Sequence, residues 1–466
     1  MTPSLEHTLL KKQLVFTAQP NQSTIDSEIK SYVSNLENKS FNVLTATQGE
    51  PSITPNKRIA VCFSGGPAPG GHNVVYALAE LCHEGHTLYG INGGPGGLLK
   101  GDLFELTLDT CEDYLNVGGF HLLKTDRTKI KSAEQFEQVK HVVRQYKLDG
   151  LIIIGGDDSN TNAVLLANEL ISENCSVIGV PKTIDGDLTS PPYLPVSFGF
   201  HSACDTYAAM VTALIRDTHS SQKYWHIVKL MGRSASHITK QVAKQTNPDL
   251  FFIGEYLSRD NITLSQVIDT IAEHILKSNK NSKNFGVVLL PEGLLEWTPD
   301  VKALIAELNT VLSHDLVTID TVVAKLNPNN ASLFKSFPEY IQQQLLMDRD
   351  SHGNVQLSRI ETERLVIDML TTVLAEKNSS YKFDALPHFY GYEGRCCDPN
   401  AFDADFCLQL GYIAGQLALQ GFTGYMAACD GTRQDNKCYG VPIASLLNME
   451  QRHGKKSPVI EKTVVR

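Results

Sequence analysis

Residues 58–73 read RIAVCFSGGPAPGGHN, which is an apolar run followed by a glycine-rich segment. The uninterrupted run Ile59–Phe63 is typical of a strand that is buried on both faces of a parallel sheet. The glycines of Ser64–Asn73 let the backbone approach an anion closely, and a following helix N-terminus favours negative charge. The segment is neither a G-x-G-x-x-G fingerprint nor a Walker loop, because no Gly-Lys-Ser/Thr follows. It predicts a phosphate-binding turn, with a purely structural turn as the alternative.

The alternation of strand and helix continues beyond this turn. Stretches such as Thr161–Leu170 and Ser202–Ile215 have helical patterns and connect further apolar runs. These short runs lie at Thr87–Ile91, Leu151–Ile154, Val177–Val180, Ile227–Leu230, Phe251–Ile253 and Val287–Leu290. The pattern predicts an α/β chain with parallel sheets, and a length of 466 residues indicates two or three domains.

Two regions depart from this pattern. Between about Glu296 and Lys382 the strand signal fades, and Val301–Leu312 and Ile360–Ala375 show helical periodicity. We expect a helical insertion there, with the α/β pattern resuming at His388. Residues 1–56 lack a clear strand–helix rhythm, so we expect an N-terminal extension that is partly helical.

The composition excludes several classes of protein. Hydrophobic residues make up 42% and charged residues 20%, which is typical of a chain that folds. A formal net charge of −10 and the lack of a long Lys/Arg run argue against nucleic-acid binding. We find no signal peptide and no uninterrupted apolar stretch long enough to span a membrane. The ten cysteines include no C-x-x-C pair, which favours reduced thiols in a soluble cytoplasmic protein.

Acidic residues follow the next predicted strand, in the segment Gly155–Ser159. Ser159 can cap a helix, which is the structural alternative. Two adjacent carboxylates, Asp157 and Asp158, exceed what a cap requires. A carboxylate at this place can hold Mg²⁺, which prefers oxygen ligands and keeps substrate phosphates in its shell.

A third loop, Pro181–Asp187, follows the run Val177–Val180. Asp185 and Asp187 are spaced to serve as a general base and a metal partner, and Lys182 offers a phosphate contact. An ordinary surface turn is the alternative.

Weaker candidates follow later strands. Arg233 in Met231–Ser234 is a plausible phosphate anchor or a solvated helix-start arginine. Glu292 can bind sugar hydroxyls or belong to a turn, and Tyr392–Arg395 is uninformative alone. We reject a metal site at His83–His86, because Gly85 interrupts the helix and the spacing is not H-E-x-x-H.

The order of these motifs resembles the phosphofructokinase family, specifically its pyrophosphate-dependent branch, from about Arg58 to the C-terminus. The intervening residues agree as well as the motifs do. These further matching segments are Gly118–Phe120, Arg127–Lys129, Phe198–Phe200, Met231–His237 and Ile360–Glu363. Several collinear motifs are far more specific than any single one.

The resemblance implies an enzyme that reversibly transfers a phosphoryl group from pyrophosphate to the 1-hydroxyl of fructose 6-phosphate, with Mg²⁺, in glycolysis or gluconeogenesis. It assigns Asp185 as the base, with Asp187 and Lys182 supporting catalysis, and Asp157 as the metal ligand. The implied donor-binding residues are Gly65, Gly66, Arg127, Asp158 and Lys182. The implied sugar-binding residues are Thr183, Asp185, Lys223, Met231, Gly232, Arg233, Glu292, Tyr392 and Arg395, with Lys223 acting in a neighbouring subunit.

The resemblance also implies two doubly wound, mostly parallel-sheet domains and a homo-oligomer, either a dimer or a tetramer. We expect a donor domain at 57–197 with 395–445, and a sugar-phosphate domain at 198–394 with 446–466 that contains the helical insertion. ATP-dependent relatives carry glycine where Asp158 and Lys182 stand, so these residues favour pyrophosphate. The alternatives are an ATP-dependent phosphofructokinase, a non-catalytic regulatory subunit, and another kinase with a Gly-Gly-Asp loop.

Overall fold

The chain divides into two compact units in the computed structural model. Unit 1 comprises residues 1–203 and 392–463, and unit 2 comprises residues 204–391 and 464–466. The structure describes residues 14–19, 25–37, 40–83, 85–311, 318–347, 355, 357, 360–431, 437–452 and 455–465.

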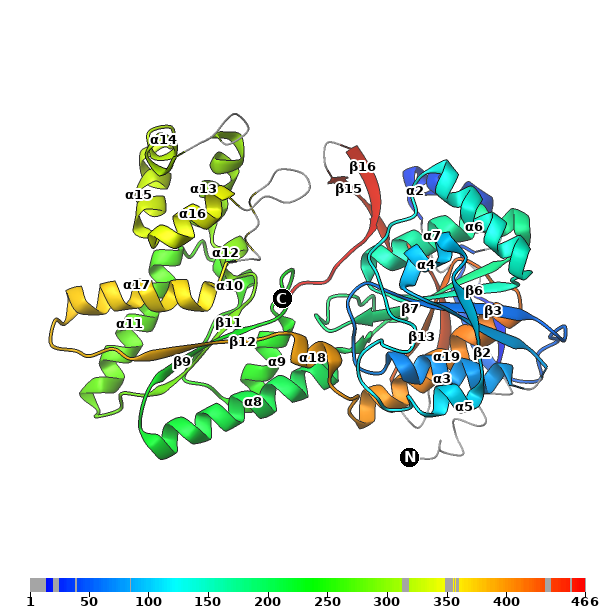
Figure 1. The fold of residues 1–466 in the computed structure, drawn as a ribbon, viewed down its shortest axis with the longest axis horizontal. Coiled ribbons are helices and arrows are strands. Elements are labelled where there is room, and N and C mark those ends of the chain that lie inside the picture. The colour runs from blue at the N-terminus through cyan, green and yellow to red at the C-terminus, as the bar shows by residue number, and fades with distance from the viewer. Residues whose placement is uncertain are drawn as a thin grey trace. The chain divides into compact units, whose positions relative to one another are not determined.

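Unit 1 is built around a ten-stranded sheet (Figure 1). Its strands are β1 (Leu14–Ala18), β2 (Leu44–Gln48), β3 (Arg58–Ser64), β4 (Thr87–Ile91), β5 (Leu103–Leu106), β6 (Gly150–Gly155), β7 (Ser176–Thr183), β8 (Phe198–Gly199), β13 (Tyr425–Cys429) and β14 (Cys438–Pro442). The order is β1-β2-β14-β13-β7-β6-β3-β4-β5, and β8 pairs with β7. The central strands β13, β7, β6, β3 and β4 are parallel, whereas the outer pairings are antiparallel.

The order of the central strands reverses between β3 and β6. From β3 the chain proceeds to β4 on one side, whereas β6 leads to β7 on the other side. Ligands of open α/β sheets bind outside the carboxyl ends of the strands at such a reversal. The turn after β3 and the turn after β6 flank this point, so the topology alone places the glycine-rich and acidic loops together.

Helices cover both faces of this sheet (Figure 1). The unit 1 helices are α2 (Ser27–Tyr32), α3 (Gly71–Cys82), α4 (Gly94–Lys100), α5 (Leu108–Glu112), α6 (Ala133–Tyr146), α7 (Asp157–Leu170), α18 (Tyr392–Cys396) and α19 (Ala401–Leu419), with 3-10 turns η1 (Ser34–Leu36), η2 (Ile171–Glu173) and η4 (Ile443–Leu446). Helices α3 and α19 pack together on one face, and α4, α6 and α7 lie on the other. A hairpin of β15 (Leu447–Arg452) and β16 (Lys455–Ile460) packs against α7.

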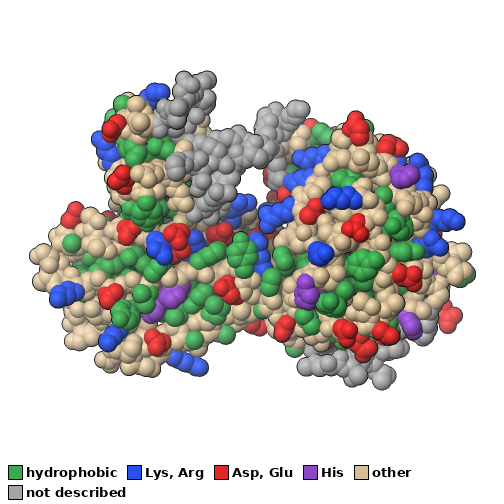
Figure 2. Space-filling view, in the orientation of Figure 1, with side chains coloured by type: hydrophobic (Ala, Val, Ile, Leu, Met, Phe, Trp, Pro, Cys, Tyr) green, Lys and Arg blue, Asp and Glu red, His purple; other side chains and the backbone are tan. Residues whose placement is uncertain are grey.

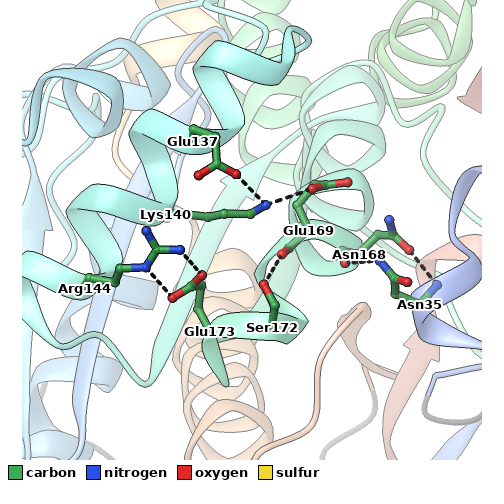
Figure 3. Close-up of polar contacts among 8 residues, drawn as sticks. All are labelled: Asn35, Glu137, Lys140, Arg144, Asn168, Glu169, Ser172 and Glu173. Carbon is green, nitrogen blue, oxygen red and sulfur yellow. Dashed lines mark hydrogen bonds and ion pairs between the residues drawn. The ribbon is translucent and has the colours of Figure 1, made fainter.

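Polar contacts tie α6, α7 and the N-terminal segment together (Figure 3). Lys140 on α6 reaches Glu137 at 2.9 Å and Glu169 of α7 at 3.2 Å. The amide of Asn35 donates to the Asn168 side chain at 2.9 Å. A surface ion pair contributes only about 0–1 kcal/mol to folding stability. These contacts therefore mainly fix the orientation of α6 and α7 relative to each other.

Unit 2 has a smaller, four-stranded parallel sheet. Its strands are β9 (Trp225–Leu230), β10 (Leu250–Phe251), β11 (Gly286–Pro291) and β12 (Ala385–Tyr390), in the order β10-β11-β9-β12. Its helices are α9 (His237–Thr246), α10 (Gly254–Arg259), α11 (Leu264–Lys280), α12 (Leu294–Trp297), α13 (Pro299–Val311), α14 (Ile319–Val323), α15 (Pro328–Ser336), α16 (Glu339–Met347) and α17 (Thr362–Lys377), and α8 (Phe200–Ser221) leads into the unit from unit 1. Helices α11 and α17 share a buried core with the sheet, and α13 to α16 form a separate apolar cluster.

The predicted α/β class, the parallel strands and the helical insertion are confirmed. Strands β6, β7, β9 and β11, which contain four of the predicted apolar runs, are buried at every position. The run Phe251–Ile253 contributes only Phe251 to the short β10, where this side chain is exposed. Leu312, at the end of one predicted helix, lies outside the described residues.

Two expectations about the ends of the chain differ from the structure. The described part of residues 1–56 is not a separate extension, because β1 and β2 continue the sheet of unit 1 through β14. Residues 446–463, which we expected in the sugar-phosphate domain, belong to unit 1. The reason is local, since the backbone N–H of Ile460 donates to Thr161 Oγ1 on α7 at 3.2 Å.

The surface is mixed in charge. On the face drawn in Figure 2, Lys and Arg side chains are interspersed with Asp, Glu and uncharged ones. Among the described residues, no helix combines the length and the hydropathy needed to cross a membrane.

Candidate phosphoryl-transfer site

The glycine-rich turn after β3 is fixed from two sides. The Gly65 N–H donates to the Asp126 carbonyl at 2.8 Å, and Thr125 Oγ1 donates to the Gly65 carbonyl at 2.7 Å. Ser159 Oγ at the start of α7 donates to Ser64 Oγ at 2.8 Å. These bonds hold the turn after β3 against the turn after β6, at the reversal in strand order.

Two carboxylates begin α7. Asp157 and Asp158 occupy its first turn, directly after Gly156 at the N-cap. Negative charge is stabilised there, because the first backbone N–H groups of a helix are directed toward it. Both carboxylates therefore lie at a helix N-terminus at the edge of the sheet.

Asp158 has a cationic partner. Lys129 Nζ lies 2.9 Å from Asp158 Oδ2, and the two side chains are 41% and 46% exposed. Arg127, two residues earlier, is exposed. Lys129 was expected only as part of a matching segment, because its ion pair with Asp158 of α7 depends on the tertiary fold.

The loop after β7 is organised by Thr183. Its Oγ1 donates to Asp187 Oδ1 at 2.9 Å and accepts the Asp185 N–H at 3.0 Å. Asp187 is buried and Asp185 is half-buried. The more accessible Asp185 therefore suits proton transfer, whereas Asp187 supports the loop.

Lys182 lies within this group of charges. Burial lowers the pKa of Lys182 to about 8; nearby Arg395 also lowers it, whereas Asp185, Asp157 and Asp187 raise it. Lys182 is thus close enough to the carboxylates of both loops to interact with them, and its role as a phosphate contact stays a prediction.

Lys462 is a member of this group that the sequence analysis missed. Its Nζ lies 3.1 Å from Asp187 Oδ2 and 3.5 Å from Asp157 Oδ2. Burial lowers the pKa of Lys462, but Asp187, Asp157 and Asp185 together raise it above the ordinary value. No motif surrounds this lysine near the C-terminus, so only the tertiary structure reveals it.

Arg395 lies beside the glycine-rich turn in unit 1. A Cβ added to Gly66 would come within 3.1 Å of Arg395 Nη1, so glycine permits the close approach. Tyr392 is 69% exposed, and the Arg395 guanidinium lies 5.6 Å from its ring centroid. The resemblance groups both residues with the sugar, whereas the structure places the Arg395 guanidinium beside the glycine-rich turn.

Unit 2 brings a second set of predicted residues together at the carboxyl ends of β9 and β11. The Gly232 N–H donates to Glu292 Oε2 at 3.0 Å, and the Glu292 N–H donates to the Leu230 carbonyl at 2.9 Å. The Arg233 carbonyl would lie 2.3 Å from a Cβ on Gly293, so only glycine fits there. Met231 is buried and Arg233 is exposed.

Lys223 does not join this group within one chain. It is exposed and precedes β9, whereas Met231 follows the same strand. A six-residue strand spans about 20 Å, which separates Lys223 from Arg233 along the sheet. This position agrees with the expectation that Lys223 serves a neighbouring subunit, which stays a prediction.

The rejected metal site at His83–His86 has a different role. Glu84 lies outside the described residues. The Lys57 N–H donates to His86 Nδ1 at 3.2 Å, so this histidine supports the backbone.

A divalent cation fits the acidic group of unit 1. Asp157 and Asp187 are hard oxygen donors, and both lie beside the Lys462 ammonium, which is 3.1 Å from the buried Asp187 Oδ2. No group of three or more His, Cys, Asp or Glu is arranged to hold a metal in the part of the chain that the structure describes. Such a site suits an ion that is held by one or two carboxylates and by substrate phosphates.

The α/β fold and an anion-binding turn beside carboxylates are typical of proteins that transfer phosphoryl groups. A comparison with family profiles matches the phosphofructokinase family over residues 58–418. The chain therefore belongs to the phosphofructokinase family. Phosphotransferases of this family generally need a divalent metal.

Two curated relatives illustrate the branch to which the chain is similar. The chain is 44% identical over 430 residues to the pyrophosphate–fructose 6-phosphate 1-phosphotransferase subunit beta of Solanum tuberosum, covering 90% of this chain and 75% of that protein. It is also 44% identical over 430 residues to the pyrophosphate–fructose 6-phosphate 1-phosphotransferase of Treponema pallidum, covering 88% and 75%.

Solved structures support the fold. The pyrophosphate-dependent phosphofructokinase from Nitrosospira multiformis aligns with a TM-score of 0.59 at 15% identity, covering 88% of this chain and 86% of that one. At this identity the likeness concerns the fold alone.

Proposed function

We propose that this protein reversibly transfers a phosphoryl group from pyrophosphate to the 1-hydroxyl of fructose 6-phosphate, giving fructose 1,6-bisphosphate and phosphate. The relatives that match most of the chain carry this activity in their names. The proposal rests mainly on one observation: Lys182 interacts electrostatically with both Asp185 and Asp157 beside the glycine-rich turn.

Asp185 is the general base in this proposal. Its carboxylate accepts the proton of the 1-hydroxyl while that oxygen forms a bond to the near phosphorus of pyrophosphate. The bridging P–O bond breaks, and its electron pair leaves with the departing phosphate. The Thr183 hydroxyl holds the Asp185 backbone, so the base is positioned before the substrate binds.

Positive charge and backbone amides bind the donor. The turn at Gly65 and Gly66 adds little bulk, and the Gly66 N–H is proposed to bind the donor because the Gly65 N–H is bonded to the Asp126 carbonyl. Buried Lys182 supplies a compact positive charge. Mg²⁺ is the proposed cation, with Asp157 as its ligand, and when bound it offsets negative charge on the phosphate oxygens. Arg127 is exposed and has access to the donor from solvent.

The choice of pyrophosphate over ATP rests on Asp158 and Lys182. A carboxylate side chain at Asp158 takes space that a glycine would leave for a nucleoside. Lys129 offsets much of the negative charge of Asp158. ATP is therefore excluded more by the volume of this pair of side chains than by charge repulsion.

The acceptor site is proposed in unit 2. Arg233 is suited to the 6-phosphate, because a guanidinium matches phosphate oxygens in bidentate geometry. Glu292 receives the Gly232 N–H through one oxygen and keeps its other oxygen for sugar hydroxyls. Tyr392 and Lys223 are assigned to the sugar by resemblance, the latter from a neighbouring subunit of a homo-oligomer.

We place the enzyme in the cytoplasm, where both glycolytic and gluconeogenic directions are open to it. A non-catalytic subunit is less favoured, because Lys182, Asp185 and Asp187 are all present and grouped. An ATP-dependent enzyme is disfavoured by Asp158.

The test follows the reaction in both directions. Purified protein with Mg²⁺, pyrophosphate and fructose 6-phosphate is monitored by phosphorus NMR, and the reverse mixture contains fructose 1,6-bisphosphate and phosphate. We expect the same equilibrium mixture from either side. If pyrophosphate is neither consumed in the forward mixture nor formed in the reverse mixture, the proposal is contradicted.

A further inference from the structure

The segment that follows β16 is attached to the loop that carries the proposed base. The backbone N–H of Thr463 donates to the Asp187 carbonyl at 2.8 Å, and Thr463 Oγ1 contacts the same carbonyl at 3.1 Å. Thr189 Oγ1 lies 3.1 Å from Thr463 Oγ1. One residue earlier in the chain, Lys462 is therefore held at a fixed place beside this loop.

The other end of the segment is attached to α7. The Ile460 N–H donates to Thr161 Oγ1, and Thr161 Oγ1 lies 2.9 Å from the Asp157 carbonyl oxygen. The segment thus connects the first turn of α7 with the loop after β7. These are the two elements that supply the carboxylates of the site.

The Lys462 ammonium lies between those carboxylates. It is within 3.5 Å of both Asp157 and Asp187, and Asp187 is only 4% exposed. Removing one partner of a buried charge leaves the other uncompensated, which is costly. Lys129 pairs with Asp158, whereas Lys462 pairs with Asp157 of the first loop and Asp187 of the second.

We propose that Lys462 is a positioning residue of the phosphoryl-transfer site, one that holds Asp157 and Asp187 in place and competes with the divalent cation for Asp157. Only the kinetic effect expected from this inference depends on the proposed function. Its electrostatic consequence is independent, because a cation beside Asp157 weakens the binding of a second cation there whatever the reaction is.

The first test measures metal binding without substrates. Mn²⁺ is titrated into the wild-type protein and into Lys462→Met, and bound metal is followed by electron paramagnetic resonance. We expect Lys462→Met to bind Mn²⁺ about tenfold more tightly, which corresponds to about 1.4 kcal/mol. Lys456→Met is the matched control, because Lys456 lies on the preceding strand, is exposed and pairs with distant Glu28.

The second test measures kinetics. We expect Lys462→Met to lower kcat with pyrophosphate about 10- to 100-fold while KM for fructose 6-phosphate changes less than about twofold. Lys462→Arg should recover most of the loss, since it restores the charge, and thermal unfolding checks that each variant is folded. If Lys462→Met does not fold, the same Mn²⁺ affinity and kcat are measured on Lys462→Gln instead.

The outcomes separate the two proposals. If the wild-type enzyme has no activity with pyrophosphate, the proposed function fails, but the Mn²⁺ comparison still tests Lys462. If the folded Lys462 variants bind Mn²⁺ with wild-type or weaker affinity, or turn over at the wild-type rate, the role of Lys462 is overturned.

Discussion

The buried ammonium of Lys182 should give the pyrophosphate reaction a pH dependence on its basic side. Burial and the nearby Arg395 lower the pKa of Lys182 to about 8, which outweighs the opposing effect of three aspartates. A lysine is charged below its pKa and neutral above it. The donor needs the charged form, so kcat/KM for pyrophosphate should fall as the pH rises through about 8.

The size of the effect follows from the pKa. A group with a pKa of about 8 is about 90% protonated at pH ~7 and about 10% protonated at pH ~9. If only charged Lys182 is productive, kcat/KM falls about tenfold between those values. The dependence belongs to the free enzyme, because kcat/KM reports the ionisation of the free enzyme and free substrate.

The assay measures kcat/KM at a constant concentration of the magnesium–pyrophosphate complex, so that ionisation of the donor is held apart from that of the enzyme. Lys182→Met is the comparison, and it should be less active at pH ~7 with a flat profile up to pH ~9. A wild-type profile that stays flat over this range, or a decline that persists in Lys182→Met, refutes the reasoning.

Asp185→Ala should lower kcat about 10²- to 10⁴-fold with little change in sugar binding, measured by steady-state kinetics and fructose 6-phosphate titration; near-normal turnover removes it as the base. Arg233→Ala should raise KM for fructose 6-phosphate much more than KM for pyrophosphate, and the reverse pattern assigns it to the donor. Arg395→Ala should raise both KM values, because the resemblance assigns Arg395 to the sugar and its guanidinium lies beside the glycine-rich turn; an effect on the sugar alone argues against a role at the donor. Asp158→Gly should raise the ATP-to-pyrophosphate ratio of kcat/KM about tenfold or more, whereas Lys129→Met should raise it less, since only the first change opens space. An unchanged ratio in Asp158→Gly argues against exclusion by volume.

The loops of the site were predictable because each follows a continuous apolar run. Such runs are buried strands, and the carboxyl ends of neighbouring parallel strands meet at one edge of the sheet. Lys182, Asp185 and Asp157 could therefore be grouped from the sequence alone. Their hydrogen bonds could not be predicted, because the Thr183 contacts depend on the conformation of one short loop.

Other features depend on contacts between distant parts of the chain. Lys462 follows a hairpin whose packing against α7 no local pattern encodes. The strands β1 and β2 are short and partly exposed, so their apolar signal is weak, and β14 supplies the edge that β2 joins. The motif around Arg395 resembles sugar-binding residues, and only the three-dimensional structure shows that its guanidinium lies beside the turn at Gly66.

The most direct test of the central claim is the ratio of kcat/KM values for pyrophosphate and ATP, measured on one preparation with saturating fructose 6-phosphate and Mg²⁺. We expect rapid formation of fructose 1,6-bisphosphate with pyrophosphate and at least about a 10³-fold lower kcat/KM with ATP. This ratio corresponds to a difference of about 4 kcal/mol in activation free energy between the two donors. Rapid turnover with ATP and none with pyrophosphate would contradict the donor assignment at Asp158 and Lys182.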